Sequence, residues 1–249
     1  MFNKIIVTLF AFGGLLFPTL TRASDWVQPG GGTFAQVADG GGARTTITLV
    51  NLDGVPAPYI LNFFDESGNP MTLSTTSGQA NSLTGTLPVN GSTIIQTSGA
   101  GTTQLVGYGV LVTQNTIAGS LVFGLQLGVF TEASCPLDTG QDNFFGLPFD
   151  QTTSTEGIAI ANGHGNGPVT VTVTFYDQTG TKIPTATTTI LLGGTNPQHQ
   201  SFLLPTRFPE ANGKKGFVVF QGSSNFNLLG LRATNTTLTS VTPIVPLGF

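Results

Sequence analysis

The chain carries one stretch twice, and this repeated stretch decides the fold. Residues 38–51 are ADGGGARTTITLVN, and residues 149–162 are FDQTTSTEGIAIAN. Aligned without a gap, they share three identical residues, each pair 111 positions apart: Asp39 with Asp150, Ile47 with Ile158, and Asn51 with Asn162. Further on, FFD at 63–65 matches FYD at 175–177. A repeat of this length has the size of a small domain, so the sequence predicts two copies of one domain.

Composition favours strands over helices. Charged residues make up only 8% of the 249-residue chain and hydrophobic residues 39%, with 34 Gly and 19 Phe. Thr, Ser, Asn and Gln take the polar positions that helices would give to Lys and Glu, which favours strands and tight turns. The net charge of −4 lacks the basic footprint of a nucleic-acid-binding protein, so no nucleic-acid partner is expected.

Residues 1–23 are predicted to be a signal peptide. Lys4 precedes the apolar run 5–17, and Ala23 is a small residue before a cut at Ser24. An uncleaved membrane anchor is the alternative, but the run is short and is followed by Pro18 and Arg22. Because no other stretch is long enough to cross a bilayer, the mature chain is expected to be secreted or at the cell surface, with the periplasm as a further location.

Alternating segments divide the rest of the chain into two similar parts. Domain 1 is predicted over 24–131, a linker over 132–144, and domain 2 over 145–249. Each part contains about seven short apolar segments with a period of two, the pattern of half-buried strands. Asn90-Gly91 in the first part predicts a hairpin, and the loop GGTNP at 193–197 is its counterpart.

These patterns predict an all-β protein of two tandem antiparallel β-sandwich domains, of the immunoglobulin or fibronectin type. One continuous barrel or sandwich is the rival fold. Cys135 is the single cysteine, so no internal disulfide can form. We expect it to be an inert thiol in the linker, and a disulfide to another chain is the alternative.

The signature TTITLVN at 45–51 with FFDESGNP at 63–70, followed by glycine-rich strands, resembles a repeat of secreted proteins from environmental bacteria. Those are tandem Ig-like β-sandwich domains of unknown function. The shared residues belong to strands and turns, so the resemblance implies architecture and no catalytic residues. The second copy departs from it, having lost the triple glycine and the Asn-Gly turn.

Few residues are candidates for chemistry. His199 near Ser201 could form a Ser–His–acid set with Asp177 or Asp150, although no nucleophile elbow is present. Asp138, Asp142 and Asn143 could supply oxygen ligands to calcium, but their spacing is not that of an EF-hand loop, and a solvated acidic linker is the alternative. Paired Asp residues at strand ends are better explained as turn residues whose side chains bond the loop backbone. No other cofactor is expected.

Exposed aromatic rings are the last candidates, because sugar-binding modules stack on them. Trp26 is the single tryptophan, and Tyr176 should point outward since Phe175 points inward. We therefore expect a non-enzymatic surface, adhesive or extracellular-matrix module, whose partners are cell-surface glycans, matrix or other surface proteins. A carbohydrate-binding module of a polysaccharide-degrading system is the alternative, and a hydrolase is a third candidate.

Overall fold

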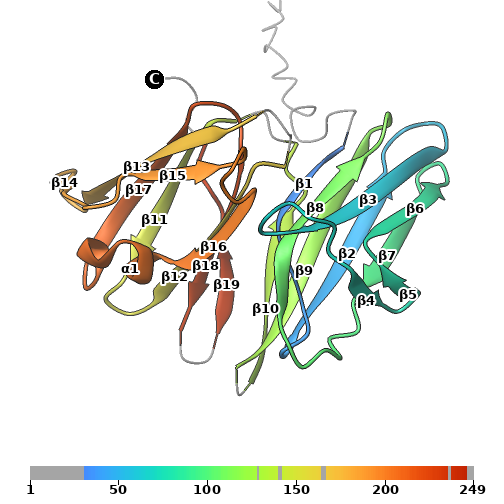
Figure 1. The fold of residues 1–249 in the computed structure, drawn as a ribbon, viewed down its shortest axis with the longest axis horizontal. Coiled ribbons are helices and arrows are strands. Elements are labelled where there is room, and N and C mark those ends of the chain that lie inside the picture. The colour runs from blue at the N-terminus through green and yellow to red at the C-terminus, as the bar shows by residue number, and fades with distance from the viewer. Residues whose placement is uncertain (1–30, 128, 140–141, 164–166, 235–236, 246–249) are drawn as a thin grey trace, which may run out of the picture.

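The computed structural model describes residues 31–127, 129–139, 142–163, 167–234 and 237–245. Over these residues the protein is all-β, with several antiparallel sheets and no closed barrel. We call residues 31–139 the first half and residues 142–245 the second half (Figure 1). The first half contains ten strands: β1 (Gly32–Asp39), β2 (Ala43–Asn51), β3 (Ala57–Asp65), β4 (Leu73–Thr75), β5 (Gly78–Ala80), β6 (Ser82–Leu87), β7 (Ser92–Gln96), β8 (Leu105–Val112), β9 (Ile117–Leu127) and β10 (Val129–Pro136).

Two four-stranded sheets enclose the core of the first half. The β3 sheet has the order β1-β8-β3-β6, and the β2 sheet has the order β10-β9-β2-β7. Alternate residues of both sheets point inward and are fully buried, among them Leu49, Leu61 and Phe63. This is the period-two pattern of the sequence, with apolar side chains inside and Thr, Ser and Asn outside. The β4–β5 hairpin is an addition to this plan.

The second half repeats the same plan. Its elements are β11 (Phe144–Asp150), β12 (Thr155–Ala161), β13 (Val169–Asp177), β14 (Lys182–Ile183), β15 (Thr189–Leu192), β16 (His199–Leu203), the short helix α1 (Leu204–Arg207), the 3-10 turn η1 (Pro209–Ala211), β17 (Lys215–Gly222), β18 (Asn227–Ala233) and β19 (Leu238–Val241). The β13 sheet runs β11-β17-β13, with β14 and β15 both on β13, and the β12 sheet runs β16-β12-β18-β19. Strand for strand, these are the orders of the first half.

The repeat extends to the closing bridge of each half. Thr33 of β1 exchanges two backbone hydrogen bonds with Asp138, of 2.7 and 2.9 Å. Gly146 of β11 exchanges two such bonds with Ile244, both of 2.8 Å. In each half, therefore, the segment after the last strand crosses over to the first strand and closes one side of the pair of sheets.

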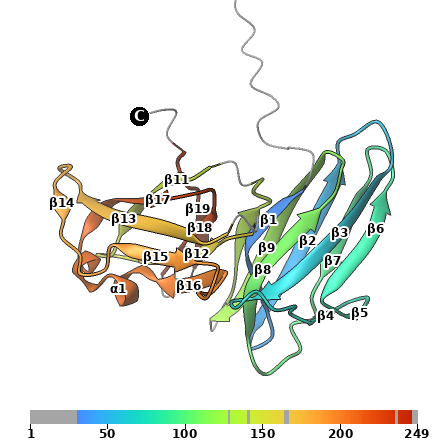
Figure 2. The ribbon, with the colours of Figure 1, turned by 45° about the horizontal axis from the view of Figure 1, so that its top comes forward.

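The two halves are packed against each other through different surfaces. β1 and β10 of the first half lie against the outer face of the β12 sheet, with β10 beside β19. Figure 2 shows the strands of the two halves running at a steep angle to each other at this contact, which we call the seam. Ala159, Leu229 and Leu238 of the second half are buried there and belong to the core of the first half. The backbone of Ser134 in β10 is hydrogen-bonded through its N–H and its carbonyl to the hydroxyl of Ser240.

The same outer face is polar in the first half. Ala159 corresponds to half-buried Thr48 in the repeat, and Leu229, its neighbour on β18, corresponds to exposed Ser120. The outer face of this sheet is thus apolar in the second half, where the seam covers it, and polar in the first half, where solvent covers it. The seam is therefore a packed interface.

Three sequence predictions need correction. Much of the predicted linker 132–144 is strand, because β10 continues to Pro136 and β11 begins at Phe144. Cys135 lies in β10 with an exposed fraction of 1%, and burial raises the pKa of its thiol to about 12. The sequence did not predict β10, because the polar side chains on its outward face resemble a break between strands.

The Asn-Gly turn does not form a hairpin. Asn90 has a left-handed conformation, with φ of 54°, but β6 pairs with β3 and β7 with β2. The turn therefore carries the chain from one sheet to the other. The 193–197 loop does the same, because β15 lies in the β13 sheet and β16 in the β12 sheet. The chain also contains the short helix α1, where the sequence predicts no helix.

Candidate functional site

The strongest candidate site lies at the seam around His199, where β16 begins. The turn 65–68 of the first half holds this position, because the carbonyl of Glu66 accepts the N–H groups of Gln198 and His199 at 2.8 and 3.1 Å. Asp65 shapes the turn by accepting the backbone N–H of Asn69 at 2.8 Å. The repeated FFD motif of the first half therefore also positions a residue of the second half.

The imidazole of His199 is completely buried between the halves. Its Nε2 lies 3.2 Å from Oε1 of Gln36, which comes from β1. The ring stacks beside Tyr108 of β8, with a centroid distance of 6.0 Å, and Tyr108 stacks in turn on Phe64 at 5.3 Å. Its Nδ1 is 3.9 Å from the Glu66 carboxylate, which is too long for a hydrogen bond.

Burial sets the protonation of this cluster. It lowers the pKa of His199 from 6.5 to about 4, against the opposing effect of a hydrogen bond to the backbone of Ala35. The imidazole is therefore neutral at pH 7. Burial also raises the pKa of Tyr108 to about 12, with a smaller contribution from the negative charge of Asp65.

A hollow of about 490 Å³ opens beside His199. Both halves contribute to it, because Glu66 comes from the first half, and β15, the 193–197 loop, β16 and α1 supply the rest. Its wall is mostly polar and is formed by Glu66, Thr189, Leu191, Asn196, Pro197, His199, Gln200, Ser201, Phe202 and Arg207.

The geometry does not form the Ser–His–acid set that the sequence allowed. Ser201 Oγ is 3.4 Å from Oε1 of Glu66, and Nε2 of His199 is bonded to Gln36. Asp150 and Asp177 both lie elsewhere, where each carboxylate accepts hydrogen bonds from its own turn. His199 is thus held by structural partners, and we assign Ser201 no nucleophilic role.

The buried imidazole predicts acid sensitivity. Since the pKa of His199 is lower in the folded than in the unfolded chain, its stabilising contribution is complete above pH 6.5 and is lost as the pH falls toward 4. The loss should reach about 3 kcal/mol. Urea unfolding at several pH values should show it, and His199→Gln, which keeps a polar side chain without titrating, should flatten the profile over this range. An identical slope in both proteins would contradict the prediction. Hydrogen bonds lower the pKa values of Asp150 and Asp177, so these residues also lose stabilising energy in acid. Their contribution is the same in both proteins and cancels in the comparison.

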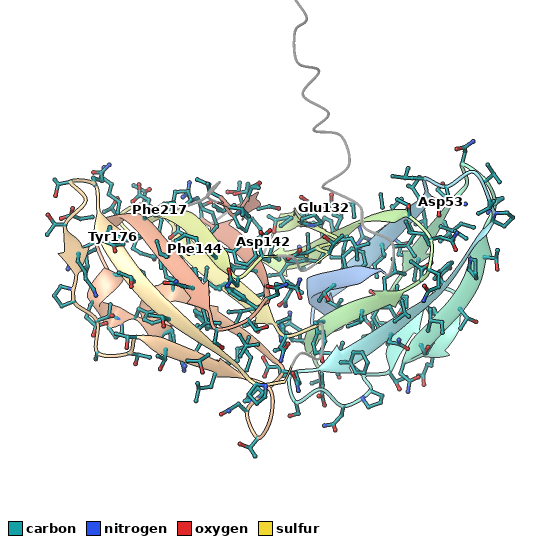
Figure 3. The ribbon with its side chains drawn as sticks, turned by 90° about the horizontal axis from the view of Figure 1, so that it is seen from above. Asp53, Glu132, Asp142, Phe144, Tyr176 and Phe217 are labelled. Atoms are coloured by element: carbon teal, nitrogen blue, oxygen red, sulfur yellow. The ribbon has the colours of Figure 1, made fainter. Side chains whose placement is uncertain are left out.

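Tyr176 lies at the opposite end of the second half and points away from the core, as predicted. It is half-buried on the outer face of the β13 sheet, opposite Phe217 of β17. The Phe217 ring covers Gly146 of β11, in the place that a side chain there would occupy. Figure 3 shows Tyr176, Phe217 and Phe144 along one side of the second half. We call these three residues the aromatic strip; the sequence singled out only Tyr176.

The backbones of the suggested calcium ligands are hydrogen-bonded within the fold. Asp138 bridges to Thr33, while the backbone carbonyls of Asp142 and Asn143 accept the N–H groups of Phe226 and Gly222 at 3.2 and 2.7 Å. Burial and the nearby charge of Asp138 raise the pKa of Asp142. Among the residues that the structure describes, no group of three His, Cys, Asp or Glu side chains could hold a metal ion. Trp26 lies outside the described residues.

Comparison of the chain with protein families, with curated proteins and with solved structures gives no match. In the described parts of the chain, no helix has the length and apolar character needed to cross a membrane. The functional argument therefore depends on the geometry of this molecule.

Proposed function

We propose that the chain is an exported surface, adhesive or extracellular-matrix module built from two tandem β-sandwich domains. The observation that carries this proposal is the seam. A chain that buries apolar side chains such as Leu229 and Leu238 between its copies behaves as one rigid spacer. Its outer strands carry mainly uncharged polar side chains, which suit a position outside the cell.

The immunoglobulin-like character of each domain is part of the proposal. In each half the second strand pairs with the fifth and the third with the sixth, if β4 and β5 in the first half and β14 in the second are set aside, and the immunoglobulin fold has both pairings. The first strand joins the sixth and the seventh joins the second, whereas the immunoglobulin fold pairs them the other way round. The domains would therefore share the architecture of the immunoglobulin fold, with the first and seventh strands on opposite sheets from their usual ones.

Fractionation of the native cells tests this function. We expect the chain in the cell-surface or matrix fraction, accessible to added protease, with its N-terminus near Ser24. A cytoplasmic protein that retains residues 1–23 would overturn the proposal. A chain that stays soluble in the periplasm would support export and refute the surface role.

Carbohydrate binding is a second candidate, and the aromatic strip favours it. Sugar rings pack their C–H faces on exposed aromatic rings, and Tyr176 and Phe217 lie side by side on adjacent strands. Asp142 lies two residues before Phe144 in the sequence, and its carboxylate could accept hydrogen bonds from sugar hydroxyl groups. The strip would then bind a glycan chain across the β13 sheet.

Replacing Tyr176 with Ala should abolish such binding. In a pull-down with insoluble polysaccharides, the wild-type chain should bind saturably and Tyr176→Ala should lose at least about tenfold in affinity, the effect of about 1.4 kcal/mol. Thr172→Ala is the matched control, because Thr172 is exposed on the same face of β13. Equal binding by all three proteins would rule out the strip as the binding surface.

A further inference from the structure

The hollow beside His199 has the features of a small binding site. It is about 490 Å³ in volume, within the range of sites that hold small molecules. Because Glu66 belongs to the first half and Ser201 and Arg207 to the second, the site exists only when the two halves are packed together. It lies on the seam, away from the aromatic strip.

One buried atom in its wall has an unmet hydrogen bond. Among the described residues, Nδ1 of His199 has no hydrogen-bond partner although the side chain is completely buried. A neutral imidazole carries a single N–H, and Nε2 lies within hydrogen-bonding distance of the Gln36 carbonyl oxygen. In the tautomer that carries the proton on Nε2, Nδ1 is an acceptor without a partner. An unpaired buried acceptor in a cavity wall points to a ligand that donates a hydrogen bond there.

The other groups define what that ligand must be. The Glu66 carboxylate, with its side chain 52% exposed, adds a second acceptor 3.9 Å from Nδ1. Arg207 supplies donors, and its guanidinium carbon lies 6.0 Å from the centre of the Phe202 ring. A ligand with a net charge would meet repulsion from either Glu66 or Arg207, whereas a neutral ligand with several hydroxyl groups can both donate and accept. Phe202 and Leu191 provide apolar surface for its C–H groups.

We propose that this hollow binds one neutral sugar residue. Because Nδ1 of His199 has no exposed surface, the exposed Glu66 side chain, 3.9 Å away, turns aside on binding. Hydroxyl groups of the sugar then donate to Nδ1 and to the Glu66 carboxylate, and other hydroxyls accept from Arg207 and Ser201. The sugar lies between Phe202 and the turn 65–68, so it contacts both halves at once. This site goes beyond the proposed structural role, because it can be filled whether or not the chain is held at the cell surface.

The test is a titration of the ¹⁵N-labelled chain from Ser24 to Phe249, followed by NMR. The probes are the methyl glycosides of glucose, galactose, mannose and N-acetylglucosamine, at millimolar concentration, with glucuronate and glucosamine as charged probes. At least one neutral glycoside should shift the His199 Nδ1 signal, and both charged probes should bind more weakly. Glu66→Gln and Arg207→Gln should each weaken binding about tenfold, as expected for a hydrogen bond to a charged group.

Two variants separate this site from others. Lys182→Gln changes an exposed charge far from the seam and should bind like the wild type. Tyr176→Ala should also bind normally, since the aromatic strip is a separate surface. The proposal is overturned if no neutral glycoside moves the His199 signal, if Glu66→Gln and Arg207→Gln leave binding unchanged, or if Tyr176→Ala abolishes it. Because the purified chain is used, failure here leaves the fractionation result unaffected.

Discussion

Replacing Ala159 with Glu should lower the free energy of unfolding by about 4 kcal/mol, the cost of an unpaired charge in a packed interior. Ala159 has an exposed fraction of 1% and lies at the seam, in the core of the first half. A carboxylate there has no room and no partner. The effect should appear in urea or thermal unfolding of the purified chain.

The repeat supplies the control for this variant. Thr48 is the counterpart of Ala159, 111 residues earlier, but its face of the β2 sheet is open and Thr48 is half-buried. Thr48→Glu should therefore change the unfolding free energy by less than about 1 kcal/mol, as exposed substitutions do. Similar losses in both variants would show that the two faces are equally buried, and the seam would be refuted.

Asn51→Asp should lower the free energy of unfolding by about 4 kcal/mol, although it only replaces the side-chain amide nitrogen with an oxygen. The Asn51 amide nitrogen donates to three carbonyls, of Val55, Leu87 and Pro88, at 2.8, 3.3 and 3.0 Å. A carboxylate can only accept, so the substitution places a negative charge against three carbonyl oxygens in a fully buried position. The amide thereby ties the end of β2 to the turn that carries the chain between sheets.

Asn162→Asp is the matched variant in the second copy. Its amide nitrogen donates to the carbonyl of Gly167 at 2.7 Å. Since the described residues give this amide one such contact in place of three, the loss should be roughly half as large. A loss at Asn162 equal to or larger than that at Asn51 would contradict this account of the repeated asparagine.

The strands could be predicted because their inward side chains alternate so regularly. The segment 169–175, with Val at 169, 171 and 173 and Phe at 175, is a strand over the whole predicted range. Strand pairing could not be predicted, because a turn such as Asn90-Gly91 has the same local chemistry in a hairpin and in a crossing between sheets. Only the long-range registers of β6 with β3 and β7 with β2 decide between them.

The seam did leave a signal in the sequence. The first copy alternates as TTITLV at 45–50, whereas the second has GIAIA at 157–161, which is apolar or small on both faces. A strand buried on both faces loses its alternation, and the structure shows β12 in that situation. The positions that differ between the two stretches, and not the identical ones, indicate the seam.

Only part of the candidate site could be predicted from the sequence. His199 could be singled out as one of two histidines, but its partners Gln36, Glu66 and Tyr108 lie 91 to 163 residues away along the chain. Glu66 lies in the FFDESGNP signature, but nothing in that stretch, or around Gln36 and Tyr108, relates these residues to His199. Gln36 is a polar residue within the apolar segment 34–38, and a buried polar partner is the physical reason for its place there.

Calorimetry of the chain from Ser24 tests the central claim most directly, namely that the two copies form one rigid unit. If the seam couples them, the chain should unfold in a single transition whose calorimetric and van't Hoff enthalpies agree. Two separate transitions, each with about half of the total enthalpy, would show that the copies fold independently and would contradict the account.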